Sequence, residues 1–78
     1  MLVLEKGINL RQLKKYGFEH SADNAFWVCI PHPTWGGSIW IEKKTRYVEV
    51  FEDDDFGQGA VEVFYDLVVD GLIKKVKD

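Results

Sequence analysis

The residues best suited to chemistry in this chain are its single cysteine, Cys29, and its two histidines, His20 and His32. A zinc site requires four ligands in paired spacing, and these three side chains cannot supply it without carboxylates from elsewhere. A cysteine nucleophile with a histidine base would need oxyanion donors, and no pattern for them accompanies Cys29 and His32. The sequence also has no glycine-rich phosphate loop and no serine elbow. We therefore expect no metal, no cofactor and no enzymatic activity.

The most acidic point of the chain is the run formed by Glu52, Asp53, Asp54 and Asp55. A calcium loop starting at Asp53 would place glycine at its sixth position and glutamate at its twelfth, but the chain has Gln58 and Phe64 there. The run is expected to be a solvated loop near the positive end of the next helix dipole. We expect its three aspartates to attract basic partners at long range.

Large aromatic side chains are the strongest candidates for a binding surface. Trp27, Trp35, Trp40 and Tyr47 fall in or between the segments that have strand character. Such residues often fill the core of a small protein, and exposed ones commonly anchor protein contacts. Both interpretations stay open from sequence alone. The leading hypothesis is a non-enzymatic accessory module in which Trp27, Trp40 and Tyr47 anchor a protein partner or a second copy of the chain.

The alternative is a nucleic-acid-associated module that uses the same aromatic face. The bases of a single strand would stack on the rings, with Lys43, Lys44 and Arg46 at the phosphates. Such platforms usually have a basic groove, whereas Glu42 and Glu49 stand close to these cations in the sequence and the net charge is −3. The composition thus disfavours nucleic acid as the partner.

Two helices are indicated by periodicity and by capping residues. The longer one lies within residues 59–76 and should end near Asp70, with Gly71 in the left-handed position after it. The shorter one starts after the N-cap Asn9 and ends at Gly17. The apolar stripe that the longer helix is expected to bury consists of Val61, Phe64, Tyr65, Val68 and Leu72.

Three strands and two shorter segments complete the predicted fold. Residues 25–30 (AFWVCI) predict a central strand, and residues 38–42 and 46–52 predict a hairpin. Residues 2–4 and 73–76 are candidates for two short strands that pair with each other. We expect one α+β domain over all 78 residues, with a small three-stranded antiparallel sheet, one short and one longer helix on one face, and the order (β)αβββα(β). Alternation places Ile39, Ile41, Val48 and Val50 on one face of the hairpin and Trp40, Tyr47, Glu49 and Phe51 on the other.

Cys29 also bears on the compartment. A lone cysteine cannot form an intramolecular disulfide, and its apolar neighbours in the sequence indicate a buried thiol in a reducing compartment. The N-terminal apolar stretch is too short for a signal peptide, and no run is long enough to span a membrane. We therefore expect a cytoplasmic protein without a membrane partner. Pro31 and Pro33 should end the strand before them, and the isomers of their peptide bonds stay open.

Three segments of the chain resemble short uncharacterised proteins of phage and prophage genomes in Gram-positive bacteria. They are residues 13–18 (LKKYGF), the aromatic-rich hairpin and residues 65–74 (YDLVVDGLIK). The resemblance lies in cap and core positions, so it implies an intracellular accessory protein of a mobile element and no catalytic residues. The predicted helix followed by GLIKK is also similar to the end of a recognition helix and the next strand in winged-helix proteins, although those proteins place a hairpin wing after that point and this chain ends at Asp78.

Overall fold

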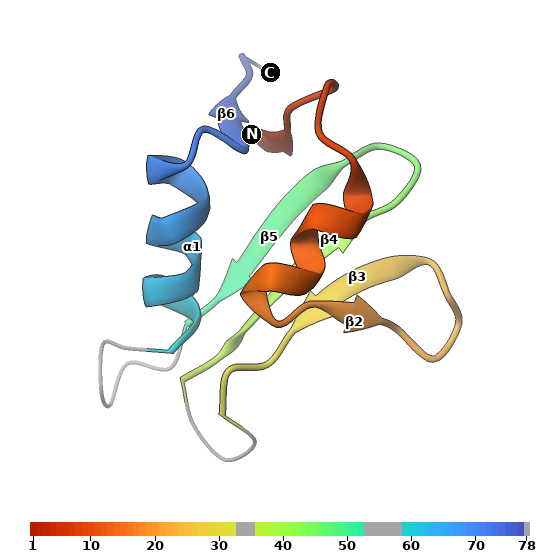
Figure 1. Cartoon of the computed structure of the whole chain (residues 1–78), viewed down its shortest axis with the longest axis vertical. Helices are drawn as coiled ribbons and strands as arrows, with labels where there is room; N and C mark the ends of the chain where they lie inside the picture. Colours follow the sequence, from red (N-terminus) through yellow and green to blue (C-terminus); the bar gives the residue numbers. More distant parts are fainter. Residues whose placement is uncertain (33–35, 53–58, 78) are drawn as a thin grey trace.

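A computed structural model describes residues 1–32, 36–52 and 59–77 of the chain (Figure 1). Its elements are, in chain order, β1 (Leu2–Leu4), the 3-10 helix η1 (Leu10–Tyr16), β2 (Glu19–His20), β3 (Phe26–Cys29), β4 (Ser38–Glu42), β5 (Tyr47–Phe51), α1 (Ala60–Val69) and β6 (Ile73–Lys75). The six strands form one antiparallel sheet with the spatial order β2-β3-β4-β5-β1-β6. The two ends of the chain therefore lie side by side in the sheet.

The expectation of a three-stranded sheet was wrong, because the sheet extends beyond β3, β4 and β5 on both sides. On one side β2 pairs with β3, with Glu19 opposite Val28. This two-residue strand is polar and exposed, so no apolar alternation marks it in the sequence. On the other side β1 pairs with β6, as expected, and also with β5, so that Val3 lies opposite both Lys74 and Tyr47. The pairing of β1 with β5 joins segments far apart in the chain, which local patterns cannot show.

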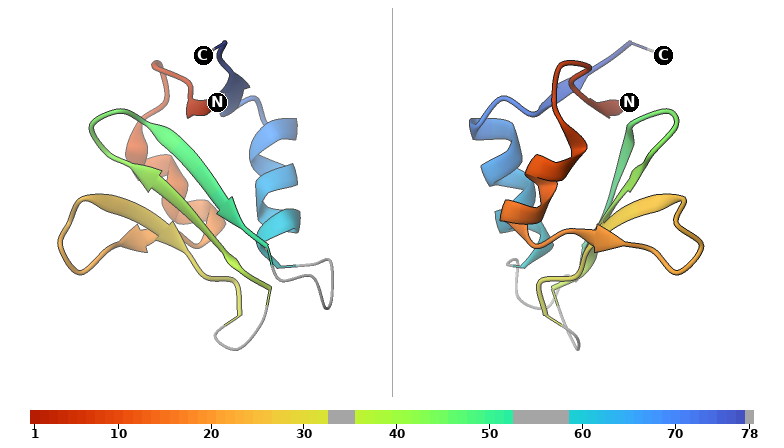
Figure 2. Two further views of the ribbon diagram at one scale, coloured as in Figure 1. Left: turned by 180° about the vertical axis from the view of Figure 1, so that it is seen from behind. Right: turned by 45° about the vertical axis from the view of Figure 1, so that its right-hand side comes forward.

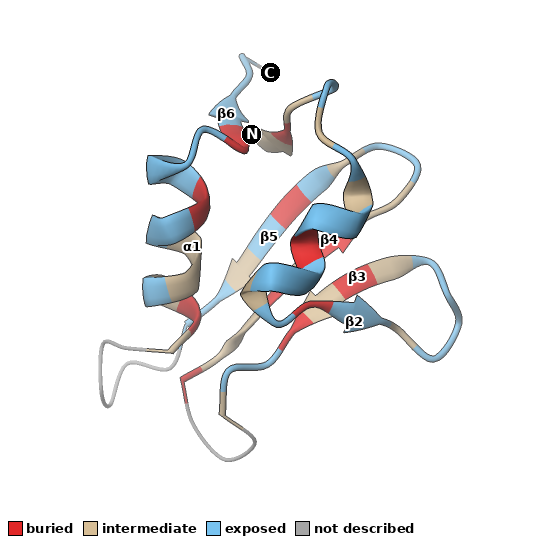
Figure 3. Ribbon diagram, viewed as in Figure 1, coloured by how far each residue is buried: buried red, intermediate tan, exposed pale blue. Residues whose placement is uncertain are grey.

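Both helices lie against the same face of the sheet, as the two views in Figure 2 show. We call this the inner face, and the face without helices the outer face. Side chains of the inner face and of the two helices form the core (Figure 3). The buried residues are Leu4, Leu13, Phe18, Trp27, Cys29, Ile39, Ile41, Val48, Ala60, Leu67, Leu72 and Ile73.

Local hydrogen bonds account for both ends of η1. The side chain of Asn9 accepts a hydrogen bond from the amide of Arg11 at 3.0 Å, which confirms Asn9 as the N-cap. At the other end Gly17 has a φ of 90°, and the amide of Phe18 donates to the carbonyl oxygen of Leu13 at 3.3 Å. Glycine adopts this left-handed conformation without a steric penalty because it has no Cβ. The predicted start and end of the shorter helix are thus confirmed.

The helix α1 also ends as predicted, but the stripe that it buries matches the predicted one only in part: Phe64 packs on the core and Leu72 is buried, as expected. Gly71 has a φ of 79°, and the amide of Leu72 donates to the carbonyl oxygen of Leu67 at 2.9 Å, as in a Schellman motif. Tyr65 and Val68, which were expected in the core, are 67% and 44% exposed. Most of the ten residues of α1 are apolar, so periodicity alone could not decide which stripe faces the sheet. The residues that pack inward are Ala60, Val63, Phe64 and Leu67.

Candidate functional site

The outer face of the β4–β5 hairpin carries the aromatic residues that the sequence suggested as a binding surface. The hairpin pairs Ile39 with Val50 and Trp40 with Glu49. Because successive side chains of a strand point to opposite faces, Ile39 is buried in the core while Trp40 and Glu49 lie on the outer face. The predicted division of the hairpin into an apolar face and a mixed aromatic face is confirmed.

Trp40 occupies the centre of the outer face. Val28 of β3 lies opposite it on one side and Glu49 of β5 on the other, so the three side chains form one row across three strands. The indole Nε1 of Trp40 donates to Oγ of Ser38 at 3.0 Å. The ring of Phe26 meets the indole edge to face, with the centroids 5.5 Å apart and the planes at 77°. These contacts hold the half-buried indole in one orientation.

Two open hollows adjoin Trp40. One, of about 440 Å³, has walls of apolar rings and polar groups, and the ring of Phe51 in it is 51% exposed. Its lining residues are Phe26, Ser38, Trp40, Glu49 and Phe51. The other, of about 410 Å³, is lined by Trp40, Val28, Ile30 and five residues in or near β2, namely Gly17, Glu19, His20, Ser21 and Ala22. We call Phe26, Val28, Ile30, Trp40 and Phe51 together the outer aromatic face.

Three carboxylates accompany these rings. None of them forms an ion pair within the described part of the chain. The outer aromatic face therefore combines apolar surface with negative charge that no lysine or arginine of the described residues neutralises. The three carboxylates belong to Glu19, which lies opposite Val28, to Glu42, which lies opposite Phe26, and to Glu49, which lies opposite Trp40.

Trp27 does not belong to this surface. It lies on the inner face and is only 4% exposed. The ring of His20 stacks on it with centroids 4.0 Å apart and an interplanar angle of 34°. Nζ of Lys43 lies 5.4 Å from the Trp27 ring centroid and 2.6 Å from Nδ1 of His20. Trp27 is thus a core residue covered by the side chains of His20 and Lys43. The structure does not bring it together with Trp40.

Tyr47 does lie on the outer face and is 43% exposed. It is opposite Val3 of β1, at the end of the hairpin away from Phe51. It therefore borders the outer aromatic face and lines neither of the two hollows. Five further residues of interest lie outside the described residues, namely Trp35, Pro33, Asp53, Asp54 and Asp55.

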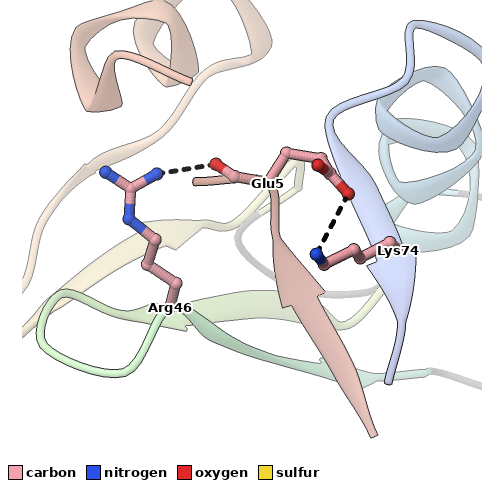
Figure 4. Close-up of polar contacts among 3 residues, drawn as sticks. All are labelled: Glu5, Arg46 and Lys74. Atoms are coloured by element: carbon pink, nitrogen blue, oxygen red, sulfur yellow. Dashed lines mark hydrogen bonds and ion pairs between the residues drawn. The ribbon is translucent and has the colours of Figure 1, made fainter. Parts of the chain in front are cut away.

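The three cations suggested as phosphate contacts are engaged or directed elsewhere. Nζ of Lys43 donates to Oδ1 of Asn24 and contacts His20, at the edge of the inner face. Nη1 of Arg46 donates to the carbonyl oxygen of Glu5 at 2.7 Å (Figure 4), and it also donates to the carbonyl oxygen of Ile8 at 3.0 Å. Lys44 is exposed and lines a different hollow, near β1 and β6. None of the three lines the hollows of the outer aromatic face.

Phe26, Ser38 and Phe51 were not singled out from the sequence as site residues. Alternation places Phe51 on the face of Trp40, which was the available signal for it. Phe26 joins the site only through the register of β3 against β4. Residues 30–37 separate those two strands and contain two prolines, so no short turn of known type defines that register. Local sequence patterns therefore could not show that Phe26 lies beside Trp40.

The Cys29 thiol and the possible metal ligands are the groups of the described residues that bear on reactive chemistry. The thiol of Cys29 is buried and donates to the carbonyl oxygen of Tyr16 at 3.4 Å, and burial raises its pKa. Within residues 1–32, 36–52 and 59–77, no group of three His, Cys, Asp or Glu residues is arranged to hold a metal ion. In the same ranges no helix has the length and apolar character needed to cross a bilayer.

The arrangement around Trp40 combines a fixed indole, an exposed phenyl ring and nearby carboxylates. No protein-family model matches the chain, and comparison with curated proteins and with solved structures gives no match either.

Proposed function

We propose that this protein is a non-enzymatic binding module whose outer aromatic face holds a basic segment of a partner protein. The observation that carries the proposal is the position of Glu49, which lies opposite Trp40 and forms a wall of the 440 Å³ hollow. A carboxylate beside an aromatic ring favours an arginine or lysine side chain, because the cation can pair with the carboxylate and lie over the ring. Glu19 and Glu42 extend the same preference along the face.

Trp40 would supply most of the binding free energy. Its orientation is already set by Ser38 and Phe26, so a partner would lose little affinity to ordering of the indole. Truncation of a central interface tryptophan typically costs about 2 kcal/mol or more of binding free energy. The half-exposed ring of Phe51 would cover the aliphatic stem of the partner's basic side chain.

Nucleic acid receives less support as the ligand of this face. Glu19, Glu42 and Glu49 would repel phosphates, and Lys43, Lys44 and Arg46 do not line its hollows. The carboxylates of Asp53, Asp54 and Asp55 would add to the attraction of a basic partner, and this stays a prediction.

The resemblance of residues 13–18, the aromatic hairpin and residues 65–74 to phage and prophage proteins supports a further part of the proposal: the module serves a mobile genetic element. A cytoplasmic location fits the buried free thiol of Cys29, which a reducing compartment would leave unmodified. Synthesis of the protein in a lysogenic host, followed by fractionation, tests that location.

The test of the binding proposal uses two mixtures of short peptides that differ only in charge, one with Arg and Lys and one with Asp and Glu at the same positions. We expect the basic mixture alone to shift amide resonances of β3, β4 and β5 in NMR spectra. Glu49→Lys should then weaken the best basic peptide about tenfold or more, and Phe51→Ser should weaken it as well. Tyr65→Ser is the matched control, because Tyr65 is exposed on α1 and should leave the affinity unchanged.

Three outcomes would overturn the proposal. Equal binding of both peptide mixtures would show that charge does not select the partner. A molecular mass that doubles with concentration, and returns to that of a monomer in Phe51→Ser, would identify a second copy as the occupant. Binding of a single-stranded oligonucleotide to the same amides, weakening as salt rises, would establish the nucleic-acid alternative instead.

A further inference from the structure

A third hollow, separate from the outer aromatic face, concentrates positive charge. It has a volume of about 460 Å³ and lies where β1 and β6 meet the β4–β5 turn. Four of its eight lining residues are basic, and none is acidic. We call it the basic hollow, and its lining residues are Val3, Leu4, Lys6, Lys44, Thr45, Arg46, Lys74 and Val76.

Arg46 builds the frame of the basic hollow. It has a φ of 64°, which turns the chain at the start of β5. Its Nη1 donates to the carbonyl oxygens of Glu5 and Ile8, and its own carbonyl oxygen accepts from the amide of Leu4 at 2.9 Å. These three hydrogen bonds fix the β4–β5 turn against the segment that follows β1. Figure 4 shows Arg46 and Lys74 on either side of Glu5.

The lysines of the basic hollow are only partly neutralised by the described residues. Nζ of Lys74 lies 3.8 Å from Oε1 of Glu5, with 48% and 38% of the two side chains exposed, which makes a loose and screened ion pair. Lys6 and Lys44 are exposed and form no ion pair with the described residues. Among the residues that the structure describes, four cations thus meet one carboxylate, in a protein whose net charge is −3. The excess of positive charge is local to the basic hollow and does not follow from the composition of the chain.

The chemistry of the lining favours a phosphate group. Ammonium groups bind phosphate as mobile point charges and need no fixed geometry, so three lysines from separate segments can converge on one dianion. Binding would also relieve the repulsion among them. Val3, Leu4 and Val76 offer apolar wall for the remainder of a ligand. The volume falls in the range of about 300–1,000 Å³ that is typical of small-molecule sites.

We propose that the basic hollow binds the phosphate of a small organic phosphate of about mononucleotide size. Lys6, Lys44 and Lys74 would contact the phosphate oxygens, and Arg46 would act as the positioning residue. This site is independent of the outer aromatic face, because the two share no lining residue.

The test is an NMR titration of the full chain at low ionic strength with inorganic phosphate, pyrophosphate and adenosine monophosphate. We expect saturable shifts of amides in residues 3–6, 44–46 and 74–76, with adenosine monophosphate binding at least as tightly as phosphate. The double variant Lys6→Gln/Lys44→Gln should bind about tenfold more weakly, because each exposed cation contributes a few-fold in affinity. Both lysines are exposed, so the variant should keep the wild-type melting temperature.

The matched control is Lys14→Gln/Lys15→Gln, which removes the same charge from the last turn of η1 and should leave binding within about twofold. An equal loss in both double variants would overturn the proposal, since binding would then follow net charge. Shifts spread over the whole surface, or none that saturate, would do the same. An affinity for single-stranded oligonucleotides that keeps rising with their length would show a track for a polyanion and not a site for a small phosphate.

Discussion

At the scale of single residues, Tyr16 connects the two helices. Its phenol donates to Oδ2 of Asp70 at 2.6 Å, which joins the end of η1 to the residue that caps α1. The hydrogen bond to Asp70, with smaller effects of burial and of the nearby negative charges, raises the pKa of Tyr16 to about 12. Tyrosine in the unfolded chain titrates near pH 10, so folding stabilises the protonated phenol.

We therefore predict that Tyr16→Phe lowers the free energy of unfolding by about 0.5–1 kcal/mol at pH 7, measured by urea denaturation. The difference between the two proteins should hold below pH 10 and vanish as the pH rises through 12, because the phenol then ionises in the folded protein too. Tyr65→Phe, on the exposed side of α1, serves as the control. A difference that grows above pH 10 would contradict this account.

Among the glycines described, Gly37 is the one where an added methyl group would come closest to other backbone atoms. Its φ is 72°, and a Cβ built there would lie 1.8 Å from the carbonyl oxygen of Phe51. We predict that Gly37→Ala destabilises the protein by more than about 2 kcal/mol, because the backbones of two paired strands must separate. Gly7→Ala should change stability by less than about 0.5 kcal/mol, since nothing lies within 4 Å of its added Cβ. Similar melting temperatures for the two variants would refute the prediction.

Cys29 should be unreactive in the folded protein. Its thiol is buried and its pKa is raised by desolvation, so little thiolate is available to attack a disulfide reagent. We expect labelling by a chromogenic disulfide to be slow in buffer and fast in denaturant. Fast labelling of native protein, at the rate seen in urea, would show that the inner face opens readily near Cys29.

At the scale of elements, α1 is held by its inner stripe. Leu67 is fully buried, whereas its neighbour Val68 is 44% exposed. We predict that Leu67→Ala lowers the free energy of unfolding by about 2–5 kcal/mol, and that Val68→Ala lowers it by less than about 0.5 kcal/mol. Chemical denaturation of both variants decides between this stripe and the one expected from periodicity. A larger loss for Val68→Ala would place the helix in the other orientation.

The elements also show how far the sequence predicts this fold. The caps at Asn9, Gly17 and Gly71 could be recognised because they depend on hydrogen bonds within a few residues. The β4–β5 hairpin could be recognised because its alternation is regular. β2 and the pairing of β1 with β5 could not, since a short polar strand and a contact between distant segments leave no local pattern.

The candidate site was predictable to a lesser degree. Alternation already separates Trp40 from the apolar face of its hairpin, because Ser38 and Glu42 share its side of the strand. Both faces of residues 25–30 are apolar, so only the position of the helices shows that Trp27 lies in the core. The basic hollow could not be predicted from local patterns, because its lysines come from three separate segments of the chain.

At the scale of the whole molecule, β6 completes the sheet by pairing with β1, and Ile73 of β6 lies opposite the buried Leu4. We predict that removal of residues 73–78 abolishes cooperative thermal unfolding, because β1 loses a neighbour and the core loses Ile73. A chain lacking only residues 77–78 is the control and should unfold cooperatively. An unchanged melting temperature after the longer deletion would mean that β5 alone holds β1.

The place of β1 between β5 and β6 has a consequence for how the protein is made. Residues 2–4 are synthesised before both of their neighbours in the sheet, and β6 is the last of the described strands to be made. The hairpin and β3 can pair while the chain is still growing, because their contacts are between consecutive strands. β1 therefore gains its second neighbour only once β6 has been made, and until β1 docks the growing chain carries an unpaired edge on β5 that chaperones or other nascent chains can reach.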